Sequence, residues 1–174
     1  MSVDRNIILT GFMGTGKSTV GRILARRLKR RFIDTDALVE QLTGLSIPEI
    51  FQRHGEDYFR QQESTVIATL NRYPPGSLVV ATGGGAVLKA SNRCNLRRTG
   101  IIVLLTAPPE EILRRIDGKP GRPLMSGTSP AETMRALLQT REPYYRDCDL
   151  MVSTAGKTPS RVASEIMAWL SCNR

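Results

Sequence analysis

The feature that most constrains the fold is a glycine-rich segment, 11–18, which reads GFMGTGKS and follows the apolar run 7–9. This spacing is that of a phosphate-binding loop between a strand and a helix. Its glycines let the backbone curl around an anion with N–H groups pointing inward, and the next helix adds unpaired N–H groups. Lys17 can reach the terminal phosphates, and the Ser18 hydroxyl can hold a magnesium ion. The segment therefore predicts binding of a nucleoside triphosphate.

Short apolar runs recur after this segment, and amphipathic helical stretches separate them. Their apolarity is continuous rather than alternating, which is typical of strands that helices cover on both faces. We therefore predict an α/β fold of three layers, α/β/α, with a doubly wound parallel sheet. The predicted strands are 7–10, 31–33, 77–82, 101–106 and 149–153.

Three helix starts carry sequence signatures. Capping boxes begin at Ser46 and at Ser129, and Thr158 stands directly before a proline. The last helix has one apolar stripe that includes Trp169, so we place this side chain in the core rather than against a ligand.

Size and composition favour a single domain over residues 1–174. No run approaches the length of a membrane span and no signal-peptide core is present, which predicts a cytoplasmic protein with no membrane partner. The cysteines at 94, 148 and 172 are odd in number and far apart, so we expect them to be reduced. The one histidine, His54, is expected at the surface or at a helix end.

The chain is basic, with 25 Lys and Arg against 16 Asp and Glu, a net charge of +9. Such a charge attracts anions of every kind. Six of the basic residues fall within 22–31, on and just after the helix that follows the phosphate-binding loop. We interpret them as a solvated basic face. A nucleic-acid patch is the alternative, and the absence of interleaved aromatic residues leads us to predict no nucleic-acid partner.

Segment 117–128 has three glycines, two prolines and no period, which predicts a mobile surface loop. It carries Arg122. In an enzyme that transfers phosphate, such a loop is a candidate lid that closes to exclude water. A plain linker is the alternative.

Ligands of doubly wound sheets bind beyond the carboxyl ends of the strands. Asp34 and Asp36 follow the second predicted strand, and in an extended chain their side chains would point to the same side, about 7 Å apart. One carboxylate can support magnesium through its water shell, while the other accepts a hydrogen bond or a proton from an incoming hydroxyl. The alternative is that one of them caps the next helix.

Two further features suggest a substrate site. Glycines 83–85 end the third predicted strand, where they can offer backbone N–H groups to a ligand. Arg60 and Arg141 lie on predicted helices among apolar neighbours, and two isolated guanidiniums suit a substrate that carries a carboxylate. Alternatively, Arg60 forms a surface salt bridge with Glu63 at i+3.

Together these segments resemble the shikimate kinase family. The matching segments follow the family's order and approximate spacing, at 11–19, 34–36, 59–63, 83–85, 122–124 and 141–144. The resemblance implies a fold like that of the nucleoside monophosphate kinases, with a five-stranded parallel sheet, a lid near 117–128 and a substrate-binding region near 34–62. It implies magnesium-dependent transfer of the ATP γ-phosphoryl group to the 3-hydroxyl of shikimate, a step of aromatic amino-acid biosynthesis, by a monomer.

The resemblance also implies roles on the acceptor side. Asp36 resembles the aspartate that bonds the ring hydroxyls and takes the proton, and Asp34 resembles the one that orients magnesium through water. Arg60 and Arg141 resemble the pair that grips the carboxylate of shikimate, beside the backbone of Gly84.

On the nucleotide side, Lys17 and Arg122 resemble the residues that stabilise charge on the transferred phosphate, and Arg115 the one that stacks on adenine. Lys157 stands where the family usually has an arginine, so we expect a weak nucleotide contact there. The ATP-binding residues implied are Gly14, Thr15, Gly16, Lys17, Ser18, Thr19, Arg115, Arg122 and Lys157, with Ser18 also on the metal.

Other functions stay open at this point. A kinase for another hydroxy acid, such as gluconate, is the nearest alternative. A regulatory GTPase would need an Asn-Lys-x-Asp element to read guanine, and the chain has none.

Overall fold

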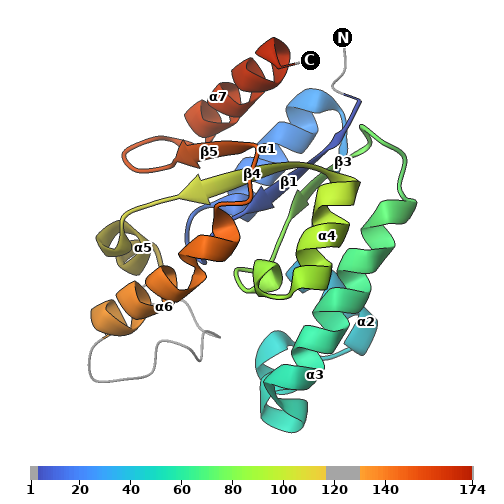
Figure 1. The fold of residues 1–174 in the computed structure, drawn as a ribbon, viewed down its shortest axis with the longest axis vertical. Helices are drawn as coiled ribbons and strands as arrows, with labels where there is room; N and C mark the ends of the chain where they lie inside the picture. Colours follow the sequence, from blue (N-terminus) through green and yellow to red (C-terminus); the bar gives the residue numbers. More distant parts are fainter. Residues whose placement is uncertain (1–3, 117–129, 174) are drawn as a thin grey trace.

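The computed structural model describes residues 4–116 and 130–173. Five strands form one parallel sheet in the order β2-β3-β1-β4-β5 (Figure 1). These strands are β1 (Asn6–Thr10), β2 (Arg31–Asp34), β3 (Leu78–Ala81), β4 (Gly100–Thr106) and β5 (Leu150–Ser153). Each strand matches a predicted one to within a residue at either end. The predicted sheet is therefore confirmed.

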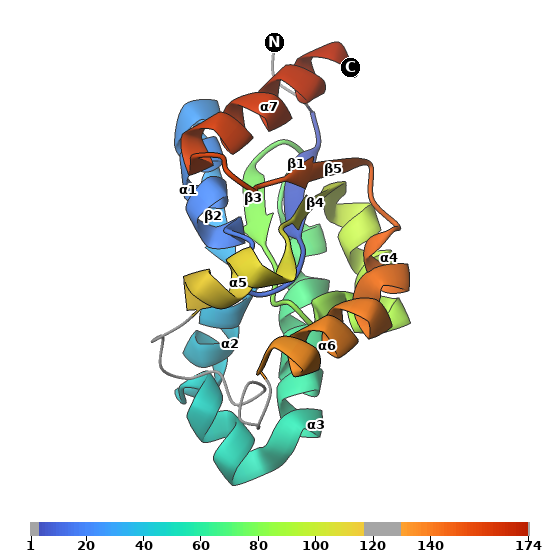
Figure 2. The ribbon, with the colours of Figure 1, turned by 90° about the vertical axis from the view of Figure 1, so that its left-hand side faces the viewer.

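Helices lie on both faces of this sheet, as predicted. In Figure 2, α1 and α7 cover one face, whereas α4 and the C-terminal part of α3 lie against the other. The helices are α1 (Lys17–Leu28), α2 (Thr35–Thr43), α3 (Ile47–Thr69), α4 (Ala90–Thr99), α5 (Pro109–Ile116), α6 (Pro130–Tyr145) and α7 (Pro159–Cys172), with short 3-10 turns η1 (Leu70–Arg72) and η2 (Ala86–Leu88).

The central strand β1 shows why the strands are apolar throughout. Ile7 and Leu9 pack on the side of α1 and α7, where they meet Leu24 and Ile166. Ile8 points the other way, into the second core cluster. Because successive side chains of a strand alternate between faces, a strand covered on both faces must be apolar at every position.

The strand pairing decides which loops become neighbours. Leu9 of β1 is in register with Ala81 of β3, and Thr10 is in register with Leu104 of β4. All five strands run in one direction, so their carboxyl ends share one edge of the sheet. The phosphate-binding loop after β1 therefore lies directly beside the glycines that follow β3.

The helix boundaries agree with the sequence signatures. Ser46 starts α3 with a complete capping box, and the Thr158 hydroxyl at the start of α7 accepts a hydrogen bond from the Arg161 N–H at 3.3 Å. Helix α6 begins at Pro130, while its predicted cap, Ser129, and the predicted lid 117–128 lie outside the described residues.

The predictions for His54 and Trp169 are also confirmed, whereas the reduced state of the cysteines stays a prediction. The three cysteines are unpaired, His54 is exposed beside a bend of α3 at Gly55 (φ 81°), and Trp169 is half-buried against the core cluster of α1 and α7. In the described part of the chain, no helix is long and apolar enough to cross a membrane.

Replacing Asn6 by alanine should destabilise the fold without changing the site. Asn6 is 2% exposed; its Nδ2 donates to the Thr99 carbonyl at 3.2 Å, and its Oδ1 accepts from the Leu78 N–H at 2.8 Å. Asn6→Ala would leave both backbone groups unpaired in the interior, so we expect a loss of ~1–3 kcal/mol in urea unfolding. Asn173→Ala, at an exposed position, is the control, and equal stability of the two variants would contradict this account.

Candidate active site

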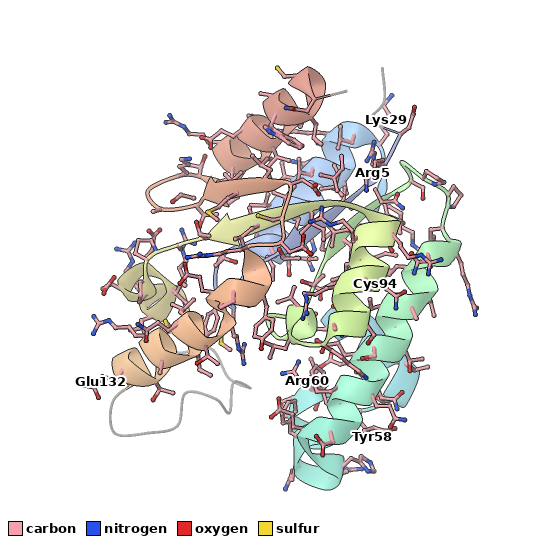
Figure 3. All side chains as sticks on the ribbon, in the orientation of Figure 1. Arg5, Lys29, Tyr58, Arg60, Cys94 and Glu132 are labelled. Carbon is pink, nitrogen blue, oxygen red and sulfur yellow. The ribbon has the colours of Figure 1, made fainter. Side chains whose placement is uncertain are left out.

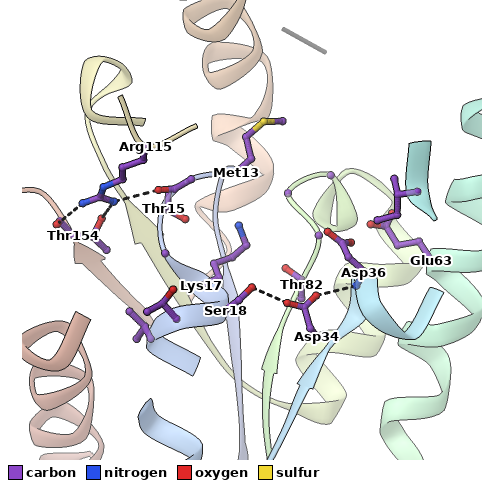
Figure 4. Close-up of a pocket in the computed structure, with 18 of the residues that line it drawn as sticks. Met13, Thr15, Lys17, Ser18, Asp34, Asp36, Glu63, Thr82, Arg115 and Thr154 are labelled. Carbon is purple, nitrogen blue, oxygen red and sulfur yellow. Dashed lines mark hydrogen bonds between the residues drawn. The ribbon is translucent and has the colours of Figure 1, made fainter. Parts of the chain in front are cut away.

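A cleft of about 810 Å³ opens at the carboxyl edge of the sheet (Figure 4). Arg115 and Thr154 lie at one end of it, Asp36 and Glu63 lie at the other, and Lys17 is between them. Every predicted site residue within the described part of the chain lines this cleft: Gly14, Thr15, Gly16, Lys17, Ser18, Thr19, Asp34, Asp36, Arg60, Gly84, Arg115, Arg141 and Lys157. Arg122 lies outside the described residues.

The phosphate-binding loop has the backbone shape that an anion requires. Gly14 and Gly16 have φ of 77° and 94°, which only glycine adopts without strain. Gly16 is the N-cap of α1 and offers no side-chain acceptor, so the first N–H groups of the helix face the cleft. Lys17 is 8% exposed, and its ammonium donates to the Gly11 and Phe12 carbonyls at 2.7 and 2.8 Å, which holds it over the loop.

Ser18 and Asp34 form the pair of hard oxygen donors beside this loop. The Ser18 hydroxyl donates to Asp34 Oδ2 at 2.7 Å, so the start of α1 and the end of β2 meet here. A hydroxyl and a carboxylate are ligand types that Mg²⁺ accepts, directly or through water. The pair therefore fits the magnesium ion that accompanies a nucleoside triphosphate.

The predicted extended geometry of the two aspartates is wrong. Asp34 is the last residue of β2 and the N-cap of α2, and its Oδ1 accepts the Asp36 N–H at 3.1 Å. Helix α2 begins at Thr35, so Asp36 lies in the first helical turn rather than two residues along a strand. The capping alternative is correct for Asp34, which caps the helix and still bonds Ser18.

Asp36 is the carboxylate that faces the open part of the cleft. Its Oδ1 is buried and has no hydrogen-bond partner among the described residues. Burial, with Asp34 and Glu63 nearby, raises the pKa of Asp36 to about 6, while Lys17 and Arg60 oppose the shift. A buried oxygen that lacks a partner is a strong acceptor for a ligand hydroxyl.

Glu63 lies beside Asp36 and has a similar environment. It is 1% exposed, and its Oε1 also has no partner within the described ranges. Burial raises the pKa of Glu63, and the Arg60 guanidinium pulls it back. Glu63 was predicted as a surface partner of Arg60, because nothing local indicates that this face of α3 is buried.

The glycines after β3 are required by the side chains that crowd them. A Cβ on Gly83 would lie 2.5 Å from Asp36 Oδ1 and 2.7 Å from Glu63 Oε1, and one on Gly85 would lie 2.5 Å from both terminal nitrogens of Arg60. A side chain at either position would require these carboxylates or this guanidinium to move from its present place.

The two predicted arginines lie in the same cleft but have different partners. Arg60 points from α3 toward α6 (Figure 3) and pairs with Glu63 at 2.9 Å and Glu56 at 3.0 Å, so the salt-bridge alternative is correct as a contact. Arg141 is only 6% exposed and lies over the Phe12 ring at 5.5 Å. No carboxylate of the described residues forms an ion pair with Arg141, which leaves a buried positive charge for a ligand.

The nucleotide side of the cleft contains contacts that the sequence did not predict. Arg115 donates to the Gly14 carbonyl at 3.2 Å and to the Thr154 hydroxyl and carbonyl at 2.9 and 3.0 Å. Lys157 pairs with Glu165 at 2.7 Å. Thr154 directly follows β5, so its place at a strand end is the sequence signal for it, as it is for Asp34 and Gly84.

Comparison with known proteins agrees with this geometry. A family model described as shikimate kinase matches residues 13–171. The chain is 48% identical over 163 residues to a shikimate kinase of Caldanaerobacter subterraneus subsp. tengcongensis, covering 94% of each chain. It is 49% identical over 169 residues to a shikimate kinase of Geobacter sulfurreducens, covering 97% of this chain and 92% of the relative.

Solved structures give the same result. Shikimate kinase from Acinetobacter baumannii in complex with shikimate superposes with a TM-score of 0.93 at 40% identity, covering 98% of this chain and 94% of the other. A gluconokinase from Sinorhizobium meliloti covers 99% and 94% of the two chains with a TM-score of 0.63, but its 21% identity shows a shared fold alone. With a family model over most of its length and close relatives of nearly equal size, this chain belongs to the shikimate kinase family.

Proposed function

We propose that this chain transfers the γ-phosphoryl group of magnesium-bound ATP to the 3-hydroxyl of shikimate, giving shikimate 3-phosphate and ADP. One observation carries the proposal: a single cleft joins a phosphate-binding loop to a buried carboxylate and two guanidiniums. Family membership supports the same reaction, and so does the shikimate bound to the relative from Acinetobacter baumannii.

The nucleotide half of the cleft would bind phosphates through backbone and charge. Open N–H groups at the start of α1 and the Lys17 ammonium would hold the β- and γ-phosphates. Ser18 and Asp34 would hold magnesium, Asp34 through water, and a bound metal ion neutralises charge on the transferred group. Arg115 and Lys157 are proposed on the adenine side. Arg122 stays a prediction from the family resemblance.

The acceptor half would bind an acid and orient its hydroxyl. Arg60 and Arg141 would grip the carboxylate, with the Gly84 backbone beside them. Asp36 Oδ1 would accept the hydrogen bond of the attacking hydroxyl and take its proton as the new P–O bond forms. A carboxylate with a raised pKa is a better base than an ordinary aspartate and is still ionised at neutral pH.

Gluconate is the nearest competing acceptor. It is a linear sugar acid, whereas the arginines and glycines of this cleft converge on a compact space. The monomeric state, the cytoplasmic location and the absence of a nucleic-acid partner stay predictions.

The substrate can be tested with an assay of ADP release under magnesium ATP. We expect turnover with shikimate and at least 100-fold lower kcat/KM with gluconate, because a site built for one set of polar groups leaves them unpaired with another. Folded protein that releases no ADP above background with shikimate would remove the proposal. Equal kcat/KM for both acids would move the assignment to a broader hydroxy-acid kinase.

Asp36→Asn should lower activity and raise stability. Loss of the base should reduce kcat by about 10²–10⁴-fold with little change in the Kd of ADP. The buried charge raises the pKa from its ordinary 3.8 to about 6, so ionised Asp36 opposes folding above pH 6. The variant should therefore be more stable by ~1–3 kcal/mol at pH 8. This gain should shrink as the pH falls below about 6 and vanish below about pH 3, where the carboxyl is protonated in both states.

Lys17→Ala is the matched control for this prediction. It should also abolish turnover, but through loss of a phosphate contact, so ADP binding in calorimetry should weaken as well. Equal loss of ADP binding in the two variants would place Asp36 on the nucleotide side instead.

In the wild type, kcat/KM for the acid should fall about tenfold per pH unit below pH 6 as Asp36 is protonated.

A further inference from the structure

Tyr145 lies behind the acceptor half of the cleft and has no role in the function described so far. It is the last residue of α6, it is 6% exposed, and its ring packs in the core cluster that contains Ala86 and Leu104. Its hydroxyl donates a hydrogen bond to the Gly84 carbonyl. Because Tyr145 does not line the cleft, it can act on a ligand only through the residues it bonds.

The first of these residues is Arg141, one helical turn earlier on α6. Residues at i and i+4 share a helix face. Burial raises the pKa of Tyr145 to about 12, and the Arg141 guanidinium opposes this shift by its charge and by hydrogen bonding, so the two groups are close. Arg141 otherwise contacts the Phe12 ring and makes no ion pair with the described residues. A neutral phenol therefore lies beside the guanidinium on the same face of α6 and does not cancel its charge.

The second group that Tyr145 contacts is the peptide between Gly84 and Gly85, through the Gly84 carbonyl. The Gly83 N–H donates to Thr35 Oγ1 at 3.0 Å, and the Gly83 carbonyl accepts from the Ala86 N–H at 3.2 Å. The N–H groups of Gly84 and Gly85 have no acceptor among the described residues, and both glycines line the cleft. Since a trans peptide points its carbonyl and N–H in opposite directions, a bond that holds the Gly84 carbonyl also sets the direction of the Gly85 N–H.

We propose that Tyr145 is a positioning residue for the acid substrate: its hydroxyl joins Arg141 of α6 to the glycine loop after β3, so that guanidinium and backbone donors converge on one carboxylate. This inference rests on the proposed function. A phenylalanine would fill the same apolar space, so packing alone gives no reason for a hydroxyl here. Fixed donors bind a ligand better because less freedom is lost on binding.

The test is Tyr145→Phe, with Tyr144→Phe as the matched control. Tyr144 is its neighbour, 39% exposed, and its ring contacts Arg93 at 5.1 Å, a contact that phenylalanine keeps. Tyr145→Phe should raise KM for shikimate about tenfold, leave KM for ATP within twofold, and change kcat less than KM. Tyr144→Phe should match the wild type in all three constants.

A loss of stability alone would not give this pattern. A general loosening of the fold would lower the amount of active protein, and thus apparent kcat, without a selective effect on the acid. If KM for ATP rises as much as KM for shikimate, or if KM for shikimate stays within twofold, the positioning role is overturned. If the wild type itself does not phosphorylate shikimate, the proposed function is wrong. That result is separate from the comparison of the two variants.

A double-mutant cycle checks that the effect passes through Arg141. Arg141→Lys keeps the charge but loses the planar fork. In that background, Tyr145→Phe should raise KM for shikimate by less than about threefold, because residues that act through one another are not additive. A full tenfold effect in both backgrounds would separate Tyr145 from Arg141 and overturn the proposed link.

Discussion

The parallel pairing of β1 with β3 on one side and β4 on the other is the constraint on which the site depends. It places the loop after β1 beside the glycines after β3. With β2 paired to β3, it also brings Asp34 Oδ2, at the end of β2, to 2.7 Å from the Ser18 hydroxyl. None of these groups is near another in the sequence. A sheet with a different strand order would keep every motif and still separate the phosphate-binding residues from the acceptor residues.

The acceptor half concentrates charge at a cost in stability. Two carboxylates, Asp36 and Glu63, are buried with raised pKa values, and each has an oxygen without a partner within the described part of the chain. Arg60 compensates Glu63, whereas Arg141 lies over the Phe12 ring and forms no ion pair within the described residues. This imbalance is what a site for an anionic alcohol needs: a positive end for the acid and a free acceptor for the hydroxyl.

The motifs could be predicted because each is local. The phosphate-binding loop, the apolar runs and the capping boxes depend on neighbours within a few residues, so they can be identified without knowledge of the fold. Asp36 was predicted in an extended chain. From the local sequence, a carboxylate that caps a helix, as Asp34 does, cannot be told from one that continues an extended segment. Thr154 and Tyr145 were missed for a related reason, since their partners are Arg115 and Gly84, far away in the chain.

The sequence by itself determined the elements, the direction of the strands and the phosphate-binding loop, because apolar periodicity and glycine spacing act over short distances. Other site residues, such as Arg115 and Lys157, were implied by the resemblance to shikimate kinases. Only the tertiary structure decided the pairing of those residues. It made Glu63 a buried acid rather than a surface partner, gave Asp34 two hydrogen bonds instead of one, and tied Tyr145 to the glycine loop. Burial and long-range contact depend on which faces meet when the helices pack on the sheet, and no single segment carries that information.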